Sequence, residues 1–404
     1  MLYLYDDAGA RRFEPFATSR PLSDMRVGAL LQRQRWQHVL ATASHGVISS
    51  PHLVGFAEFD APAHHEGDVP AGAWLVNSRA VPFLQAAPVA ARVLTIGDRV
   101  AAVRLAAPMP QERLHDPHFL LEDVRPGTGA VGDIPGVWLD HVWDIVAHLQ
   151  TALLADIPVL VATLAARPLE RADVTVLGSH GVFVADGVTV EPHVVFDTTA
   201  GPVLLCRGAS VQAFSRIVGP CFVGEASVIL GGRVSGCSIG DMCRVHGEVS
   251  ATTFVGHSNK GHDGFVGHSV LGRWVNLSAG TTTSNLKNTY GMVSMWTPDG
   301  LTNTKQQFLG TLFGDHAKTG IGLRLTTGCV FGTGVNVYDS MPPKVVAPFS
   351  WGGSVPYAEF AVDKFVDMAE RMMARRQIIM PDAARAWWRT IHRVATGDAR
   401  WPRR

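Results

Sequence analysis

The sequence has no excess of charge of either sign, no paired cysteine motif and no uninterrupted apolar run long enough to cross a membrane. Lysine and arginine together number 35, and aspartate and glutamate together also number 35. This balance gives no net field that would favour nucleic acid or an anionic membrane surface. Only a local basic patch in residues 375–404 offers a nucleic-acid role, so we expect neither partner.

The longest apolar stretch, Thr151 to Pro168, is interrupted by Asp156 and Arg167 and is a poor membrane span. The first residues reach Asp6 and Asp7 without a basic stretch, which is not typical of a signal peptide, so a cytoplasmic location is expected. The cysteines are odd in number and form no C-x-x-C pair, which predicts small buried side chains rather than disulfides or a zinc site. They are Cys206, Cys221, Cys237, Cys243 and Cys329.

The chain divides by composition into three expected domains: residues 1–170, 171–350 and 351–404. The first mixes short apolar runs with helical patterns over residues 22–40 and 141–155, which predicts an α/β layer fold. In the last, apolar residues recur at helical spacing from Val362 to Met373, and a second helix is expected to begin near Pro381–Asp382 and to carry Trp387, Trp388 and Ile391.

A six-residue period runs through residues 172–346, where a branched apolar residue is followed by glycine or another small residue. The repeats include those that begin at Val182, Val203, Ile217, Val223, Ile229, Ile239, Val266, Val275, Ile321, Val330 and Val335. Such a period fits a triangular coil in which glycine allows the backbone to bend at the corners. We therefore expect a left-handed parallel β-helix, with an ordinary glycine-rich antiparallel β domain as the alternative.

The period breaks once, in a dense polar segment from Gly247 to Asn288. A repetitive coil does not need such residues for its own stability, so this segment predicts a functional site on loops that a rigid scaffold supports.

Long motifs in the chain resemble the alternative bacterial form of the bifunctional UDP-N-acetylglucosamine diphosphorylase/glucosamine-1-phosphate N-acetyltransferase family. The likeness covers nearly the whole chain. The motifs are Arg20-Pro-Leu-Ser-Asp-Met-Arg-Val-Gly28, Asn77-Ser-Arg79, Trp143-Asp-Ile145, Gly201-Pro202, Ser258-Asn-Lys-Gly-His-Asp-Gly-Phe265, Asn285-Leu-Lys-Asn288, Gly314-Asp-His-Ala-Lys-Thr-Gly320, Pro342-Pro-Lys344 and Phe349-Ser-Trp-Gly352.

The resemblance implies acetyl transfer from acetyl-CoA to the amine of a sugar phosphate. A histidine of that family removes a proton from the amine, and the motif places His262 on it; an imidazole that titrates near neutrality suits this task. Asn285 matches an asparagine of the family's Asn-Tyr motif, although leucine replaces the tyrosine here. Asn285, Asn276 or a backbone amide would donate to the oxyanion.

Four residues are expected to bind the acyl donor or a substrate phosphate: Lys260, Asn276, Lys287 and Lys318. Other readings stay open. The asparagines would equally form an internal hydrogen-bonded ladder, and Asp315, His316 and Lys318 are either a wall of the pocket or a network between subunits. Arg375–Arg376 and Arg400–Arg404 are either solvated charge or ligands of a cofactor phosphate on a neighbouring subunit.

The first domain is expected to resemble sugar nucleotidyltransferases, with Arg20, Arg26 and Asn77 as nucleotide-binding residues and Asp6, Asp24 and Asp144 as Mg²⁺ ligands for the transfer of a uridylyl group from UTP. The alternative for an arginine near an aspartate is a structural ion pair. The usual Gly-x-Gly-x-Arg and Pro-Lys pattern is absent, because the loop after Asp7 holds a single glycine, Gly9, and leucine follows Pro21. The domain therefore either turns over UTP or only orients the β-helix.

Two rival functions remain. β-Helix acyltransferases of this kind are typically homotrimers, and a trimeric scaffold without catalysis would use the same histidines and asparagines to tie subunits together. His257 and His262 also have a spacing found in the γ-class carbonic anhydrases, whose zinc is held by three histidines. The third histidine is missing at the expected place, and His246 is too close in sequence.

Overall fold

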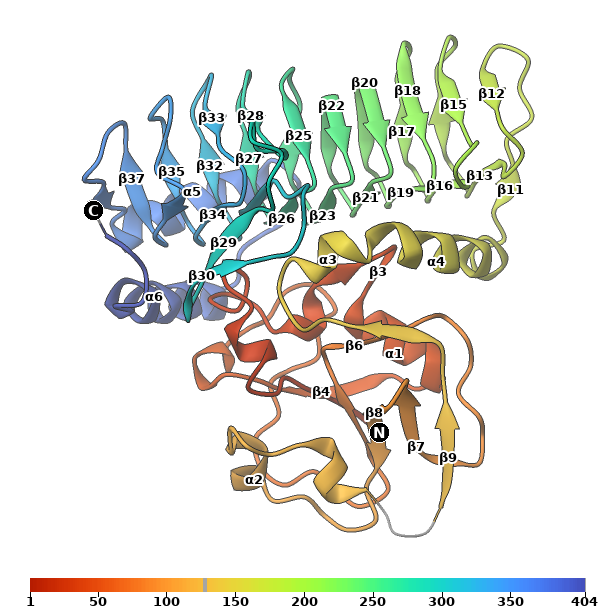
Figure 1. Cartoon of the computed structure of the whole chain (residues 1–404), viewed down its shortest axis with the longest axis vertical. Coiled ribbons are helices and arrows are strands. Elements are labelled where there is room, and N and C mark those ends of the chain that lie inside the picture. Colours follow the sequence, from red (N-terminus) through yellow and green to blue (C-terminus); the bar gives the residue numbers. More distant parts are fainter. Residues whose placement is uncertain (126–128, 404) are drawn as a thin grey trace.

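The computed structural model describes residues 1–125 and 129–403. An α/β domain, a long parallel β-helix and two C-terminal helices follow one another along the chain, as the sequence predicted (Figure 1). Arg404 of the predicted basic cluster lies outside the described residues. Within the described residues no helix is both long and apolar enough to cross a membrane.

The N-terminal domain is built on a mixed sheet in which β1 is parallel to both of its neighbours. The carboxyl ends of these parallel strands meet at one edge, where Asp6 and Asp7 follow β1. In spatial order the sheet contains β4 (Ser44–Ile48), β1 (Leu2–Tyr5), β5 (Trp74–Asn77), β8 (Arg99–Arg104), β7 (Ala91–Ile96) and β9 (Ala130–Asp133). Smaller pairs are β2 (Arg26–Val27) with β3 (Leu30–Leu31) and β6 (Ala80–Pro82) with β10 (Gly136–Trp138).

The helices of this domain differ in part from the expected ones. They are α1 (Gln32–Leu40), α2 (Gln111–His115), α3 (Asp144–Ala147) and α4 (Leu149–Thr163), with 3-10 turns η1 (Ala10–Arg12), η2 (Leu22–Asp24), η3 (Pro51–Leu53) and η4 (Leu121–Val124). The prediction of one helix over residues 22–40 was wrong in its first half, which forms η2 and the β2–β3 pair. Gly28 adopts a φ of 59° between these strands, a conformation that ends any helix.

The β-helix stacks its coils so that equivalent strands form long sheets, which are parallel except for the antiparallel strands β11 and β38 at their ends (Figure 1). One sheet contains β11 (Arg167–Pro168), β13 (Val182–Val184), β16 (Val203–Leu205), β19 (Cys221–Val223), β21 (Ser238–Ile239), β23 (Thr253–Gly256), β26 (Val270–Arg273), β31 (Thr311–Phe313), β34 (Cys329–Phe331) and β36 (Val345–Val346). A second contains β12 (Thr175–Leu177), β15 (Val195–Asp197), β18 (Ser215–Val218), β20 (Val228–Ser235), β22 (Arg244–Ser250), β24 (Asn259–Lys260), β27 (Asn276–Leu277), β32 (Lys318–Thr319), β35 (Asn336–Val337), β37 (Ser350–Gly352) and β38 (Ala358–Glu359).

Shorter strands complete the coils. They are β14 (Thr189–Val190), β17 (Ser210–Val211), β25 (Phe265–Gly267), β28 (Thr282–Thr283) and β33 (Arg324–Leu325), and the irregular segment holds an antiparallel hairpin of β29 (Ser294–Thr297) and β30 (Gly300–Asn303). All five cysteines are buried and free, as expected. The repeat expected to bury Ile321 has a different register, since Ile321 is 82% exposed and Leu323 lies inside.

Apolar side chains fill the inside of the coils, and they also cover the outer face that the ten-stranded sheet presents to the N-terminal domain. On that face α4 packs Leu153 and Ile157 against Leu204 and Phe222 of the β-helix. This apolar contact between α4 and the sheet explains why α4 runs along the coils in Figure 1. Burial on both sides of one sheet fixes the relative position of the two domains.

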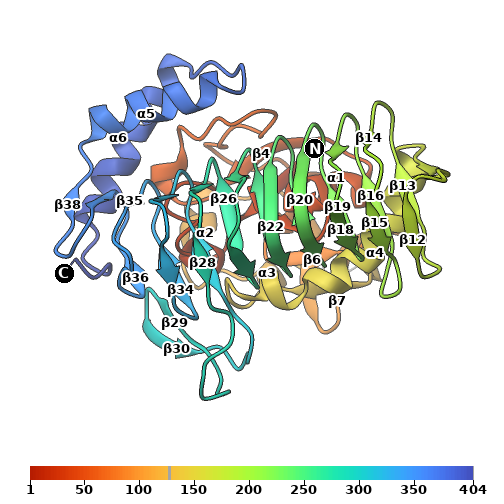
Figure 2. The same ribbon diagram turned by 90° about the horizontal axis from the view of Figure 1, so that it is seen from above.

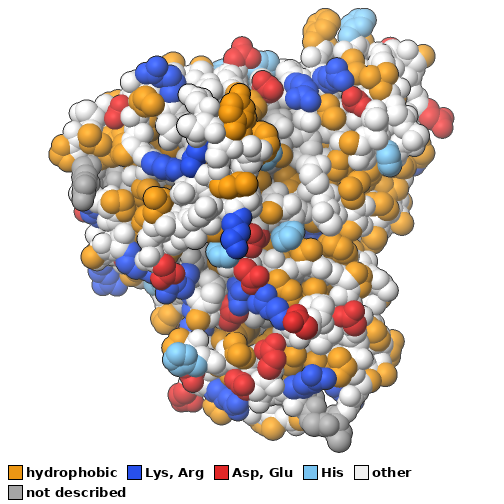
Figure 3. Space-filling view, in the orientation of Figure 1, with side chains coloured by type: hydrophobic (Ala, Val, Ile, Leu, Met, Phe, Trp, Pro, Cys, Tyr) orange, Lys and Arg blue, Asp and Glu red, His pale blue; other side chains and the backbone are white. Residues whose placement is uncertain are grey.

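The C-terminal helices α5 (Val362–Ala374) and α6 (Asp382–Gly397) lie at the C-terminal end of the β-helix (Figure 2). Phe365 of α5 packs edge-to-face on Phe349 and on Trp388 of α6, with ring centroids 5.0 and 5.1 Å apart. Elsewhere on the surface acidic and basic side chains are interspersed on the face shown in Figure 3, in keeping with the balanced composition.

Candidate functional site

The polar segment forms the outer surface of successive coils. Asn259, Asn276 and Lys318 occupy the same register position on β24, β27 and β32. Asn259 Nδ2 donates a hydrogen bond of 2.9 Å to Asn276 Oδ1. The two asparagines therefore form a ladder, and this bond does not use the N–H donors of Asn276.

His262 lies on the loop between β24 and β25, where its side chain is exposed. Two residues on, Gly264 has a φ of 126°, and a Cβ there would lie 2.2 Å from the carbonyl oxygen of Thr281 on the next coil. Only glycine allows this close approach. The loop thus presents an exposed imidazole at a corner of the β-helix.

The buried side chain of Lys260 stabilises the backbone of this corner. It is only 1% exposed, and its Nζ donates to the carbonyl oxygens of His246, at 2.8 Å, and of His262. Burial lowers the pKa of Lys260 to about 8. The ammonium therefore fixes the backbone beside His262, and its expected contact with a phosphate stays a prediction.

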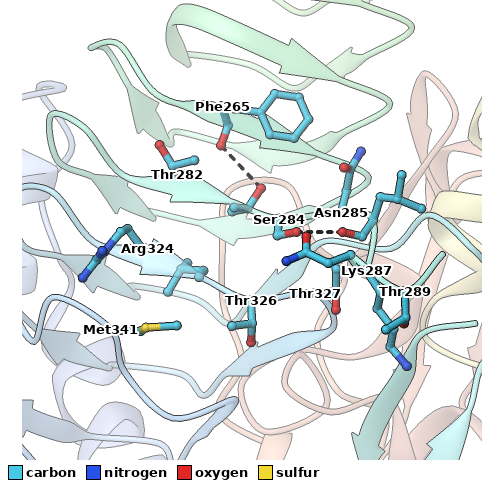
Figure 4. Close-up of a pocket in the computed structure, with 14 residues that line it drawn as sticks. Phe265, Thr282, Ser284, Asn285, Lys287, Thr289, Arg324, Thr326, Thr327 and Met341 are labelled. Carbon is cyan, nitrogen blue, oxygen red and sulfur yellow. Dashed lines mark hydrogen bonds between the residues drawn. The ribbon is translucent and has the colours of Figure 1, made fainter. Parts of the chain in front are cut away.

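Asn285 and Lys287 line one pocket of about 680 Å³ on the adjoining face (Figure 4). Lys287 Nζ donates to the carbonyl oxygen of Met292 at 2.5 Å. The pocket is lined by Phe265, Thr282, Thr283, Ser284, Asn285, Leu286, Lys287, Asn288, Thr289, Arg324, Leu325, Thr326, Thr327 and Met341. Asn276 lines a different, smaller pocket, so one chain does not bring all the expected residues together.

His268 is a residue of this region that sequence reasoning missed. Its Nδ1 accepts a hydrogen bond of 2.9 Å from Asn285 Nδ2, and Phe308 stacks on its ring at 5.4 Å. Burial lowers the pKa of His268, which keeps the imidazole neutral and able to accept this bond. The pair orients the Asn285 amide beside the pocket. No sequence pattern pointed to the contact between His268 and Asn285, which arises only because the coils stack.

In the N-terminal domain, Arg20 lies in a buried ion network rather than at the surface. Its Nε donates to Asp315 of the β-helix at 2.9 Å, its Nη1 to Asp24 at 2.9 Å and its Nη2 to Glu58 at 2.8 Å. Burial alone would lower the pKa of Arg20, but the three carboxylates raise it. Arg20 is therefore a charged contact between two domains.

Arg26, the second arginine expected to bind a phosphate, is also buried at this boundary. It donates to the carbonyl oxygens of Val255, at 3.3 Å, and of Ala29. Its Nη2 lies 3.6 Å from Asp241 of the β-helix. The nucleotide-binding role of Arg20 and Arg26 stays a prediction, since internal partners surround both groups.

The carboxylates expected to bind Mg²⁺ have internal partners as well. Asp24 accepts from Arg33 Nε at 2.7 Å in addition to Arg20. Asp6 accepts from the Leu22 amide at 3.0 Å and from Ser49 Oγ at 2.6 Å.

Asp144 lies elsewhere, where its Oδ2 accepts the backbone N–H groups of Asp140 and His141 at 2.8 Å. Asn77 donates to Asp7 at 2.8 Å. Among residues 1–125 and 129–403, no three acidic, histidine or cysteine side chains form a group able to hold a metal ion. Asp24 is paired with two arginines, whereas Asp6 Oδ1 is buried without a hydrogen-bond partner and the bonds of Asp6 and Asp144 use only Oδ2. The role of these three aspartates as Mg²⁺ ligands stays a prediction.

The histidines considered for the zinc alternative also have separate surroundings. His246 Nε2 lies 3.1 Å from Asp263, whereas His257 stacks on Phe59 and its Nδ1 accepts from Arg273 at 3.1 Å. Within the described part of one chain they do not form a ligand group.

Comparison with known proteins finds similarity in the N-terminal domain. Residues 2–163 match the sugar nucleotidyl transferase family. Bifunctional protein GlmU of Synechococcus elongatus is 27% identical over 154 residues, which are 38% of this chain and 26% of that protein. GlmU of another Synechococcus strain matches to the same extent. The chain thus spans about a quarter of the length of the curated relatives it matches.

Proposed function

We infer that this chain, whose residues 2–163 match the sugar nucleotidyl transferase family, transfers an acetyl group from acetyl-CoA to the amine of an amino-sugar phosphate such as glucosamine-1-phosphate. The observation that carries the proposal is the exposed imidazole of His262 on a corner that Gly264 and Lys260 constrain. A parallel β-helix with a polar pocket beside this corner supports it.

In the proposed reaction the amine nitrogen attacks the thioester carbonyl carbon, and His262 accepts the proton that the nitrogen loses. The tetrahedral oxyanion accepts hydrogen bonds from Asn285 or Asn276. When the carbonyl re-forms, the carbon–sulfur bond breaks, and the thiolate of CoA leaves and takes up a proton. The products are an N-acetylated sugar phosphate and free CoA.

The expected residues lie on two adjoining faces of the β-helix. We therefore propose a homotrimer in which the site is completed between subunits. Lys287 and Lys318 would then meet the substrate phosphate or the acyl donor from different chains.

The test is release of free CoA from acetyl-CoA in the presence of glucosamine-1-phosphate. We expect His262→Ala to lower kcat by about 100-fold or more, the range for a lost general base. His193→Ala is the matched control, because His193 is also an exposed histidine on a turn of the β-helix. If His262→Ala leaves the rate unchanged, the assigned base is wrong. If no amino-sugar phosphate supports CoA release, the non-catalytic scaffold is favoured.

A second candidate activity is uridylyl transfer from UTP to a sugar phosphate, which the family of the N-terminal domain supports. It would require Arg20 and Arg26 to exchange their carboxylate and carbonyl partners for a nucleotide. Release of pyrophosphate from UTP and N-acetylglucosamine-1-phosphate is the assay.

A further inference from the structure

A small pocket of about 90 Å³ lies between the β-helix and the segment that ends α5. At about 30 Å³ per water molecule, it has room for roughly three waters or one compact group. It is lined by His257, Asn259, Trp274, Asn276, Met372, Arg375 and Arg376. The two arginines follow α5 directly, and α5 lies beside the C-terminal coils in Figure 2.

The polar groups of this pocket are mainly hydrogen-bond donors. His257 Nδ1 accepts from Arg273 Nη1, so the neutral imidazole carries its hydrogen on Nε2. Asn276 Oδ1 accepts a hydrogen bond from Asn259, so the group that Asn276 can offer to a ligand is its N–H donor. Two guanidinium groups add further donors, and neither can act as an acceptor.

The positive charges of Arg375 and Arg376 are not balanced by negative charges among the lining residues. No carboxylate lines the pocket. Within residues 1–125 and 129–403, neither Arg375 nor Arg376 forms an ion pair, and the buried Nε of Arg376 has no hydrogen-bond partner. Burial and the nearby cations Arg244 and Arg375 lower the pKa of Arg376. Adjacent guanidinium groups repel each other, and a bound anion would relieve this cost.

The amine of Lys318 also approaches α5. Lys318 Nζ lies 3.0 Å from Sδ of Met372 and donates to the carbonyl oxygens of Trp274, at 3.2 Å, and of His316, at 3.4 Å. Burial lowers the pKa of Lys318 to about 7, so this amine carries a positive charge in only part of the molecules near neutral pH.

We propose that Arg375 and Arg376, with Asn276 and His257, form a binding site for the phosphate of a phosphate ester. Planar guanidinium forks match the oxygens of a phosphate, and amide and imidazole N–H groups complete its shell. The proposal rests on the proposed function only in taking this phosphate to belong to one of the two substrates, the amino-sugar phosphate or CoA.

The first test measures inorganic phosphate binding to the full chain by ³¹P NMR titration, without an acyl donor. We expect Arg376→Gln and the double variant Arg375→Gln/Arg376→Gln to weaken binding, by about tenfold or more for each arginine removed. Arg371→Gln is the matched control, because Arg371 is an exposed arginine of α5 that does not line the pocket. Equal phosphate affinity in all variants, or no saturable binding by the unmodified chain, would overturn the proposal.

Competition separates the two sources of phosphate. Displacement of inorganic phosphate by glucosamine-1-phosphate assigns the site to the sugar, and displacement by CoA but not by dephospho-CoA assigns it to the 3′-phosphate of CoA. Displacement by neither would refute the site. An inactive protein that still binds phosphate through Arg376 would count against the proposed acetyl transfer and not against this site.

Discussion

His257 shows how strongly a single residue here depends on the charges around it. Burial, reinforced by the positive charges of Arg273 and Arg376, lowers its pKa to about 2. The imidazole therefore stays neutral in the folded protein, where it accepts from Arg273 and stacks on Phe59. In the unfolded chain it would take up a proton near pH 6.5.

This difference makes folding stability depend on pH. Because the folded pKa is depressed, the unfolded state binds the extra proton as pH falls below about 6.5, and stability is lost from there down toward pH 2. We expect the free energy of unfolding, measured by urea titration, to fall between pH 7.5 and 5.5. In His257→Asn, which keeps a polar group near Arg273 but does not titrate, the fall should be smaller by about 1 kcal/mol. An equal fall in both proteins would show that His257 does not contribute.

Among the structural elements, the loop between β24 and β25 carries His262, the proposed general base. Gly264→Ala places a Cβ against the Thr281 carbonyl oxygen at a positive φ, so the loop must move. We expect a loss of about 1–3 kcal/mol in stability together with a lower rate of CoA release. Gly322→Ala is the control, since Gly322 has a φ of 75° but open space around its Cβ position. Equal effects of both variants on the rate would contradict a positioning role for Gly264.

The same elements show what the sequence can and cannot predict. The six-residue period predicted the β-helix, because glycine corners and inward apolar residues recur locally. It misplaced Ile321, since register within a coil depends on which of two neighbouring apolar residues, Ile321 or Leu323, meets the interior. The polar segment indicates where a site would lie, and that site stays a prediction. It did not show that Asn285 bonds to His268, because that contact arises only when coils stack.

In the whole molecule, Arg20 binds the N-terminal domain to the β-helix. Asp315 lies 295 residues away in sequence, so no local pattern predicts this contact, and the expected role of Arg20 at a nucleotide phosphate stays a prediction. The network continues through Glu58, which contacts Arg273 at 3.1 Å and Trp274 Nε1 at 3.2 Å. Trp274 also lines the pocket of Arg375 and Arg376, so it belongs both to the contact between the two domains and to the proposed phosphate site.

Removing Arg20 should therefore weaken the protein as a whole. Arg20→Gln leaves the buried carboxylates of Asp315, Asp24 and Glu58 without their shared cation, and we expect a loss of about 3–5 kcal/mol in unfolding free energy. Adding Asp315→Asn should recover part of this loss, because one uncompensated charge is removed, and a double-mutant cycle from urea titrations measures the coupling. Arg12→Gln, at an exposed ion pair with Asp299, should change stability by less than about 1 kcal/mol. A stable Arg20→Gln protein that fails only to bind UTP would instead restore Arg20 as a nucleotide ligand.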